Sequence, residues 1–498
     1  MAKSERERDI GAVRFLHPDH PRPRTRREFL GQGLISGAAW LMSPSLLGLF
    51  KSEQARAQAV ACGLGGPGTR VPFLVFDLGG GASLAGSNVL VGTNTQLDPL
   101  SVDGYRKMGL PSDRTPADPA FVDAQLGLAF HSESALLRGI LSRGAGTVGR
   151  VNGAVFCARS DNDTQNNPHN PIYGVNAAGA GGALLPLIGS NGSISGGRSG
   201  IPMSMFEPSV RPAVVASPNQ ARGLVDTGRL LTLLQDPADV EAVMAASQAI
   251  SGSKVAKLPE TDLVKGLINC AYQEATEIVG QFGSPAALDP TLDPEVTSVL
   301  SAGEIQNVSE FTKTATIAKL VCDGFAGAGT IEFGGYDYHD GTRATGERKD
   351  ERAGEAIGAA LQIAANKNTP LVIYVLSDGS VASDGAVDNS VDGDGKLVWR
   401  GDNSSTAASV MLAFHPSAQP QMTAVGSQVG YFRDSGSVET ISSPLADNVT
   451  ALAEAVVLNY LALHGDEGQF GSVLTNPSLG TSPAVLDPLT AFAALPGF

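Results

Sequence analysis

The segment VPFLVFDLGGGAS, residues 71–83, places an apolar run rich in valine and phenylalanine directly before three glycines. A short apolar run that ends at turn-forming residues is typical of a strand buried inside a protein. The same pattern recurs in four later segments: VNGAVFCA (151–158), GTIEF (329–333), PLVIYVLS (370–377) and SVMLAF (409–414). The sequence therefore predicts five buried strands.

Segments with apolar residues at i, i+3 and i+4 lie between and around these runs, which is the spacing of amphipathic helices. They cover residues 227–250, 262–282, 304–325, 350–368 and 448–465. Strands that alternate with such helices predict an α/β fold, with a mainly parallel sheet flanked by helices on both faces.

The chain after the N-terminal segment, residues 58–498, is predicted to form a single large α/β domain. Its block from 225 to 325 has almost wholly helical patterns, which indicates a helical insertion or subdomain between the early and late strands. Residues 177–200 are rich in glycine and serine but carry no phosphate-binding glycine motif. They are therefore predicted to be a flexible surface loop.

The N-terminal segment TRREFLGQGLISGAAWLMSPSLLGLF, residues 25–50, has the pair Arg26 and Arg27 before a modestly apolar run broken by glycines. This order resembles the twin-arginine signal, which the export machinery of that pathway recognises. Residues 1–57 are therefore predicted to be an export signal, with cleavage after Ala57 or Ala59. The alternative is lipidation at Cys62, which follows small residues in AVAC. The expected location is periplasmic or extracellular.

Removal of residues 1–57 makes an acidic chain more acidic. That segment holds 10 of the 35 Lys and Arg residues and 6 of the 50 Asp and Glu residues, so the net charge changes from −15 to −19. Binding of nucleic acid needs a positive surface, and the composition argues against such a partner. After the export signal, no apolar stretch is long enough to span a bilayer. The four cysteines are too few for a disulfide framework, and their pairing stays open.

Polar residues follow the predicted strands at the point where each strand ends. In an open α/β sheet the carboxyl ends of the strands form one edge, and ligands bind there. The residues expected at this edge are Asp77, Ser83, Asp161, Asp163, His169, Asp337, His339, Asp378 and His415. Carboxylates combined with imidazoles suit zinc, manganese or iron, whereas oxygen ligands alone suit calcium or magnesium. The glycines before Asp337 and His339 favour a ligand site at that pair.

A second acidic cluster lies in SDGAVDNSVDGDGKLVW, residues 383–399. It resembles part of a calcium-binding loop, but the twelfth position of that frame is Gly401, where a bidentate glutamate belongs. The segment is therefore interpreted as a turn-rich loop or hairpin.

Four segments of the chain resemble the bacterial DUF1501 family, whose members commonly carry twin-arginine signals and are related to the alkaline phosphatase and sulfatase fold. FGGYDYHDG (333–341) is similar to the family's GGWDTH, and NNPHNP (166–171) falls where the family has a Ser-His pair. The four segments are FLVFDLGGGASLAGSNVLVG (73–92), LAFHSESALLRGILSRGAGTVGRVNGAV (128–155), FGGYDYHDG (333–341) and VLSDGSVASDG (375–385).

The resemblance implies a site for one or two metal ions at the strand ends. In that site Asp337 and His339 are ligands, Asp378 takes the acidic position and His169 lines the pocket. Asp378 and His169 are therefore also expected among the metal ligands. Asp402 is expected where the family has an Asp-His pair, but Asn403 follows it here. Ser83 and Leu84 stand where the family loop usually carries an aspartate.

These departures remove ligands, and fewer ligands hold a metal less firmly. The expected function is therefore a binding role in the cell envelope, on an alkaline-phosphatase-like scaffold whose metal site is degenerate and has little or no catalytic activity. The alternative is a metal-dependent hydrolase of phosphate or sulfate esters. In that case Ser83 or a metal-bound water is the nucleophile, and Zn, Mn or Ca is the divalent metal.

Overall fold

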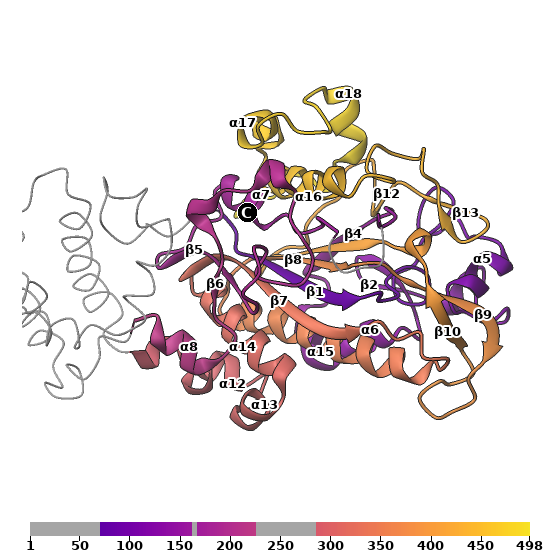
Figure 1. The fold of residues 1–498 in the computed structure, drawn as a ribbon, viewed down its shortest axis with the longest axis horizontal. Coiled ribbons are helices and arrows are strands. Elements are labelled where there is room, and N and C mark those ends of the chain that lie inside the picture. The colour runs from indigo at the N-terminus through magenta and orange to yellow at the C-terminus, as the bar shows by residue number, and fades with distance from the viewer. Residues whose placement is uncertain (1–69, 162–166, 226–284) are drawn as a thin grey trace, which may run out of the picture.

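The computed structural model describes residues 70–161, 167–225 and 285–498. The predicted export signal, Cys62 and the predicted helices between 227 and 282 lie outside these residues. The described chain is built around a sheet of eight strands (Figure 1). In spatial order they are β12 (Gln428–Val429), β4 (Val151–Phe156), β11 (Ser409–Phe414), β8 (Leu371–Ser377), β1 (Phe73–Gly80), β7 (Ala326–Tyr336), β5 (Leu185–Gly189) and β6 (Ala213–Val214).

The sheet is mainly parallel, as the alternation of strands and helices predicts. β1 pairs in parallel with both β7 and β8, and β5 pairs in parallel with β7 and with β6. All five predicted strands belong to this sheet.

The strand β11 runs antiparallel to its neighbours β4 and β8. Its carboxyl end therefore lies at the opposite edge of the sheet, and His415, which follows it, lies there too. The prediction that His415 joins the other strand-end residues is wrong. The His415 ring instead stacks against Phe498, with ring centroids 5.7 Å apart.

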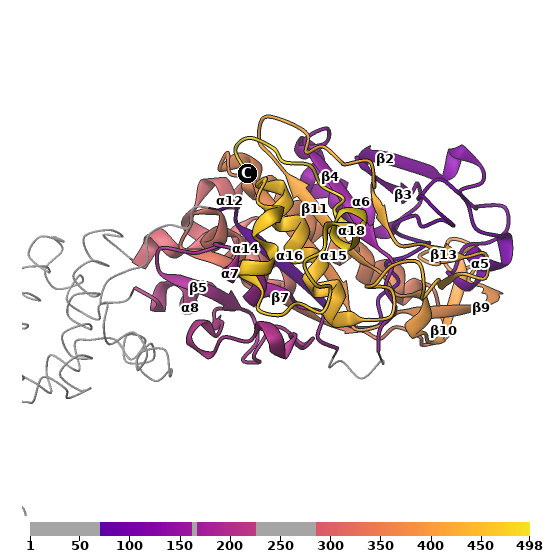
Figure 2. The same cartoon turned by 90° about the horizontal axis from the view of Figure 1, so that it is seen from above.

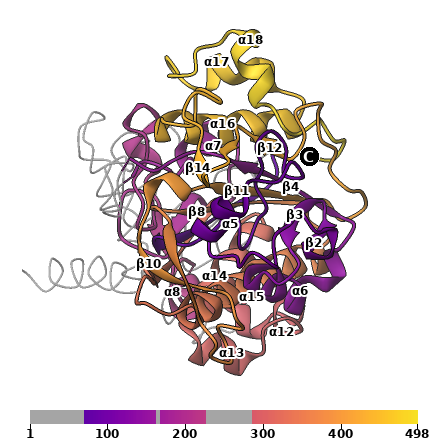
Figure 3. The same cartoon turned by 90° about the vertical axis from the view of Figure 1, so that its right-hand side faces the viewer.

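Helices cover both faces of the sheet, as Figures 1 and 3 show. One face carries α6 (Ala135–Gly144), α14 (Ser309–Cys322) and α15 (Ala344–Asn366), and the other carries α7 (Ile172–Ala177) and α16 (Val449–Leu463), which lies over the sheet in Figure 2. Side chains of β1 point alternately to the two faces of the sheet, so the strand contributes to the hydrophobic core on each face. Leu74, Phe76 and Leu78 join the first core, whereas Phe73 and Val75 join the second.

The helices α6 and α15 pack closely because glycines face the neighbouring backbone. A Cβ on Gly354 would lie 2.1 Å from the Leu136 carbonyl oxygen, and one on Gly358 would lie 2.2 Å from that of Ile140. On α6, a Cβ on Gly139 would lie 2.1 Å from the Glu351 carbonyl oxygen. Even an alanine at these positions would push the two backbones apart.

The described part of the predicted helical block, residues 285–325, is helical. The pattern over 304–325 divides into α13 (Ala302–Asn307) and α14, with Val308 between them. Ser301 and Glu304 form a capping box that starts α13.

The glycine- and serine-rich stretch 177–200 differs from its prediction as a flexible surface loop. Its segment Leu185–Gly189 forms β5, inside the main sheet. The chain then doubles back, so that a Cβ on Gly189 would lie 2.3 Å from the Gly196 Cα. Ser195 and Ser199 are buried. Because its glycines have no side chains, this loop can pack tightly against the sheet.

The remaining described elements are short. They include α5 (Val102–Lys107), β2 (Val122–Leu126), β3 (Leu128–His131), α8 (Pro218–Gly223), α12 (Pro294–Thr297), β9 (Val381–Val387), β10 (Leu397–Asp402), β13 (Phe432–Arg433), β14 (Ser437–Val438), α17 (Phe470–Val473) and α18 (Pro483–Leu486). Within the described residues, no helix combines the length and apolar character needed to cross a membrane. Cys157 and Cys322 are both buried and free.

Candidate metal centre

The strand β7 ends at Tyr336, so Asp337 and His339 lie in the loop that leaves the carboxyl edge of the sheet. This loop passes very close to the end of β1. A Cβ on Gly80 would lie 2.2 Å from the Asp337 nitrogen, and the φ of Gly80 is +137°, which side-chain-bearing residues rarely adopt. Glycine at this position therefore allows the site loop to close against β1.

Asp402 reaches the same edge from a different element. β9 and β10 form an antiparallel hairpin in which Asp402, the last residue of β10, pairs with Val381. The next residue, Asn403, donates its backbone N–H to the Ser380 carbonyl at 2.9 Å. The hairpin begins directly after β8, and it folds back so that Asp402 lies near the end of β8.

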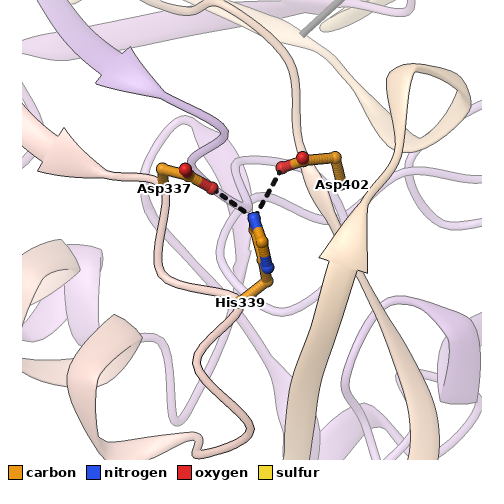
Figure 4. A group of neighbouring side chains, drawn as sticks. All are labelled: Asp337, His339 and Asp402. Carbon is orange, nitrogen blue, oxygen red and sulfur yellow. Dashed lines mark ion pairs between the residues drawn. The ribbon is translucent and has the colours of Figure 1, made fainter.

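Asp337, His339 and Asp402 converge (Figure 4). His339 Nε2 lies 2.7 Å from Asp337 Oδ1 and 3.3 Å from Asp402 Oδ1, with the imidazole pointing between the two carboxylates. One ligand atom from each residue lies within 4.8 Å of the other two. The side chains are 50%, 33% and 33% exposed in the order Asp337, His339 and Asp402, so the group is open to solvent.

This donor set fits a divalent transition metal. Zinc binds imidazole nitrogen and carboxylate oxygen at about 2.0–2.2 Å, so ligand atoms around one tetrahedral ion lie roughly 3.3 Å apart. The separation of His339 Nε2 from Asp402 Oδ1 already has this value. Asp337 Oδ1 would have to move away from His339 Nε2 by roughly 0.6 Å to reach the same separation. Half of the Asp337 side chain is exposed, which leaves it room to move.

Tyr338, between the two loop ligands, points into the protein and anchors the loop. Its buried hydroxyl donates to Asp350 Oδ1 at 2.9 Å and accepts the Ser83 backbone N–H at 2.6 Å. Asn88 Nδ2 donates to Asp350 Oδ2 at 2.7 Å. Burial raises the pKa of Asp350 to about 7. The hydrogen bonds from Asn88 and Tyr338 favour the charged form and oppose this rise, but burial has the larger effect.

Ser83, the predicted nucleophile, lies behind the loop. It is buried, and its hydroxyl lies 3.3 Å from that of Ser87. Within the described chain, no histidine or carboxylate hydrogen-bonds to the Ser83 hydroxyl, although such a contact normally activates a serine nucleophile. The nucleophilic role of Ser83 stays a prediction. Its backbone N–H helps to fix the position of Tyr338 by donating to the tyrosine hydroxyl.

Asp378 and His169 do not belong to the group formed by Asp337, His339 and Asp402. Asp378 is buried after β8, and its Oδ1 accepts the backbone N–H and the side-chain amide of Asn167 at 3.1 and 3.0 Å.

His169 is also buried, two residues beyond Asn167, and no described residue hydrogen-bonds to either of its ring nitrogens. Burial lowers the pKa of His169 to about 4, so its imidazole is neutral near pH 7. The predicted roles of Asp378 and His169 as ligands stay predictions.

The acidic cluster 383–399 forms the β9–β10 hairpin, in agreement with its interpretation as a hairpin or loop. Asp388 in this hairpin caps the start of α15. Its carboxylate accepts the backbone N–H groups of Ser390, Arg343 and Ala344 at 2.9, 2.7 and 3.2 Å. A hydrogen bond from the Ser390 side chain, together with these backbone N–H groups, lowers the pKa of Asp388 to about 2. The side chain thus stabilises a helix end.

Comparisons of the chain with models of protein families, with curated proteins and with solved structures found no match. The DUF1501 resemblance and the alkaline-phosphatase-like topology therefore stay predictions. The observations that bear on function are those of the site itself.

Proposed function

We propose that the chain is an exported protein that binds a divalent cation at Asp337, His339 and Asp402, and that it binds a ligand of the cell envelope or its surroundings through this cation. The observation that carries the proposal is the convergence of one imidazole nitrogen and two carboxylate oxygens within 4.8 Å. Three protein donors in an exposed group leave coordination positions for a ligand.

The donor set favours zinc or manganese over calcium. Calcium takes 6–8 oxygen ligands, whereas this group offers two carboxylates and one nitrogen. Imidazole with carboxylate is a common ligand set of zinc and of other first-row transition metals.

A binding role is favoured over catalysis by the position of Ser83. Its hydroxyl is buried against Ser87, behind the site loop. The second candidate, hydrolysis of phosphate or sulfate esters, is favoured by the exposure of the three donors. A bound zinc or manganese ion supplies Lewis-acid chemistry, because it polarises an ester oxygen.

Metal analysis of the purified protein tests the proposal. We expect about one zinc or manganese ion per chain, and loss of that ion in Asp337→Asn, His339→Gln and Asp402→Asn. Mutation of a residue that hydrogen-bonds to a metal ligand typically lowers the affinity for the metal by about 10–100-fold. Loss of a ligand itself should therefore lower that affinity by at least about 100-fold. Asp392→Asn is the matched control, because Asp392 is an exposed aspartate of the β9–β10 hairpin that pairs with Arg348.

An ester panel separates the two candidates. Protein that holds the ion but does not hydrolyse chromogenic phosphate or sulfate esters fits the binding role. Turnover that is lost together with the ion in His339→Gln would establish the hydrolase instead. Purified wild type that neither holds nor takes up zinc or manganese would refute both.

A further inference from the structure

The carboxyl group of Asp350, on α15, accepts hydrogen bonds from two neutral side chains. Asn88 Nδ2 donates to its Oδ2 at 2.7 Å, and the Tyr338 hydroxyl lies 2.9 Å from its Oδ1 and 3.2 Å from its Oδ2. Only 4% of Asp350 is exposed, so protein groups must supply the hydrogen bonds that water would otherwise make. Whether these groups donate or accept therefore decides which protonation state of Asp350 they stabilise.

The amide of Asn88 is fixed as a donor toward Asp350. Its Oδ1 accepts the backbone N–H of Leu136 at 3.2 Å and the Ser134 hydroxyl at 2.7 Å, both at the start of α6. Its Nδ2 donates to the Ser83 carbonyl at 2.8 Å as well as to Asp350. A backbone N–H can only donate and a carbonyl can only accept, so the amide cannot turn over without losing contacts on both sides.

The Tyr338 hydroxyl is also a donor toward Asp350. Its oxygen accepts the Ser83 backbone N–H at 2.6 Å, which leaves its hydrogen for the carboxyl group. Both neighbours thus present a hydrogen to Asp350, an arrangement that suits the ionised carboxylate. A proton on Asp350 would compete with one of these hydrogens. Because the Asn88 amide is fixed, the contact that protonation weakens is the one to Tyr338.

The charges and the burial around Asp350 determine how readily it takes up this proton. Burial is the main cause that raises the pKa of Asp350 to about 7, and the negative charge of Glu347, one turn earlier on α15, acts in the same direction. Arg343 opposes the rise, but its guanidinium donates to Glu347 at 2.7 Å. Tyr336 and Tyr338, on β7 and its loop, stay neutral because burial raises the pKa of both well above the ordinary value. Asp350 therefore exchanges its proton near neutral pH.

The contact of Tyr338 with Asp350 bears directly on the candidate metal centre. Asp337 and His339 flank Tyr338 in the loop after β7, so the position of the tyrosine restricts the backbone of both ligands. A ligand that is already in place loses less conformational entropy when the cation binds than a ligand on a loose loop.

We propose that Asp350 is a proton-sensitive anchor of this loop: the ionised carboxylate holds Tyr338 and keeps Asp337 and His339 in place for the cation, and protonation loosens the loop. The anchor deepens the proposed function, on which it rests, by giving the cation site a regulation by pH. Asp350 is a positioning residue, because it acts on the site through Tyr338. Acidification should therefore favour release of the cation.

Calorimetric titration of the full chain with Mn²⁺ at several pH values tests the anchor. Asp350→Asn cannot ionise, so it should bind Mn²⁺ about tenfold more weakly than the wild type at about pH 8, as expected for one lost hydrogen bond. At about pH 5.5 the two proteins should agree within about twofold, because the wild type is then protonated at Asp350 as well. Competition between protons and the cation at His339 occurs in both proteins and cancels in the ratio of their affinities.

Two further variants show whether the effect passes through Tyr338. Tyr338→Phe should weaken binding at about pH 8 as much as Asp350→Asn does, and the double variant should be no weaker, since the two residues act as one unit. Glu454→Gln is the matched control. Glu454 is a buried carboxylate on α16 that accepts the backbone N–H groups of Ser478 and Leu479, each at 2.9 Å. Its variant should keep the affinity and the pH dependence of the wild type.

Hydrogen exchange of the metal-free protein measures the order of the loop without the cation. After correction for the intrinsic effect of pH on exchange, the peptide that spans residues 337–341 should exchange about tenfold faster at about pH 5.5 than at about pH 8 in the wild type. In Asp350→Asn it should exchange equally fast at both pH values.

Loop exchange that does not depend on pH in the wild type, or that depends on it equally in Asp350→Asn, would overturn the anchor. So would a constant affinity ratio of the two proteins in Mn²⁺ titrations over this pH range. A different result isolates the cation. If Mn²⁺ does not bind while Asp350→Asn still abolishes the pH dependence of loop exchange, the anchor holds and the proposed cation site fails.

Discussion

The Tyr338 hydroxyl lies 2.9 Å from Asp350 Oδ1 in the protein interior, and it ties the loop that carries Asp337 and His339 to the helix α15. The two candidate ligands flank this tyrosine in the sequence, and their side chains lie on the exposed side of the loop. The interior contact therefore limits how far the two ligands can move relative to the rest of the site.

Removal of this hydroxyl should weaken both the fold and the site. In Tyr338→Phe, Asp350 loses one hydrogen bond and the Ser83 N–H loses its acceptor, which should lower the free energy of unfolding by about 1–3 kcal/mol. The affinity for Zn²⁺ should fall as well. Urea unfolding and zinc titration measure the two effects. Tyr173→Phe, which removes a hydroxyl that donates to the Ile194 carbonyl, is the control and should leave zinc affinity unchanged.

Asp350 should make part of the stability depend on pH. Its pKa is raised to about 7 from 3.8, so between these values the folded chain holds a proton that the unfolded chain releases. This contribution to stability is complete below pH 3.8 and is lost as the pH rises to about 7. The free energy of unfolding of the wild type relative to Asp350→Asn should therefore decrease from pH 4 to pH 7. A constant difference over this range would contradict the assignment.

His169 should make the stability depend on pH in the opposite direction, so that its contribution is lost as the pH falls. Its pKa is lowered to about 4 from 6.5, so the folded chain resists a proton that the unfolded chain accepts. Its contribution is complete above pH 6.5 and is lost as the pH falls to about 4. We expect His169→Gln to lose less stability than the wild type between pH 6.5 and pH 4, as measured by chemical unfolding. A parallel decline in both proteins would refute this prediction.

The contact between α6 and α15 predicts opposite outcomes for two glycine substitutions. Gly358→Ala places a methyl group 2.2 Å from the Ile140 carbonyl oxygen and should destabilise the protein by about 1–3 kcal/mol. Gly303→Ala is in the helix α13, where the new methyl group has no described atom within 4 Å apart from its chain neighbours and the helix's own backbone. It should be neutral or stabilise by up to about 1 kcal/mol, because alanine favours helix. Thermal unfolding compares the two variants.

The sequence predicts the main strands and helices because each carries an apolar pattern of the right period. The direction of β11 could not be predicted, since an apolar run such as SVMLAF reads the same in a parallel or an antiparallel strand. That ambiguity is the reason that the sequence predicts the wrong edge of the sheet for His415. The sequence does not predict the strand β5, because its five residues are embedded in a glycine-rich stretch that is typical of a loop.

The candidate site was predictable only in part. Asp337 and His339 follow a strand and two glycines, a local signal, whereas Asp402 was found through a family resemblance. Tyr338 gave one weak signal: a large aromatic residue between two polar ones implies a loop with an inward and an outward side.

The most direct test of the cation site is a crystal structure of the protein soaked with zinc, with anomalous diffraction recorded at the zinc edge. We expect one strong anomalous peak about 2.0–2.2 Å from His339 Nε2 and from one carboxylate oxygen each of Asp337 and Asp402. The absence of a peak between these three side chains at saturating zinc, with their atoms well ordered, would contradict the account.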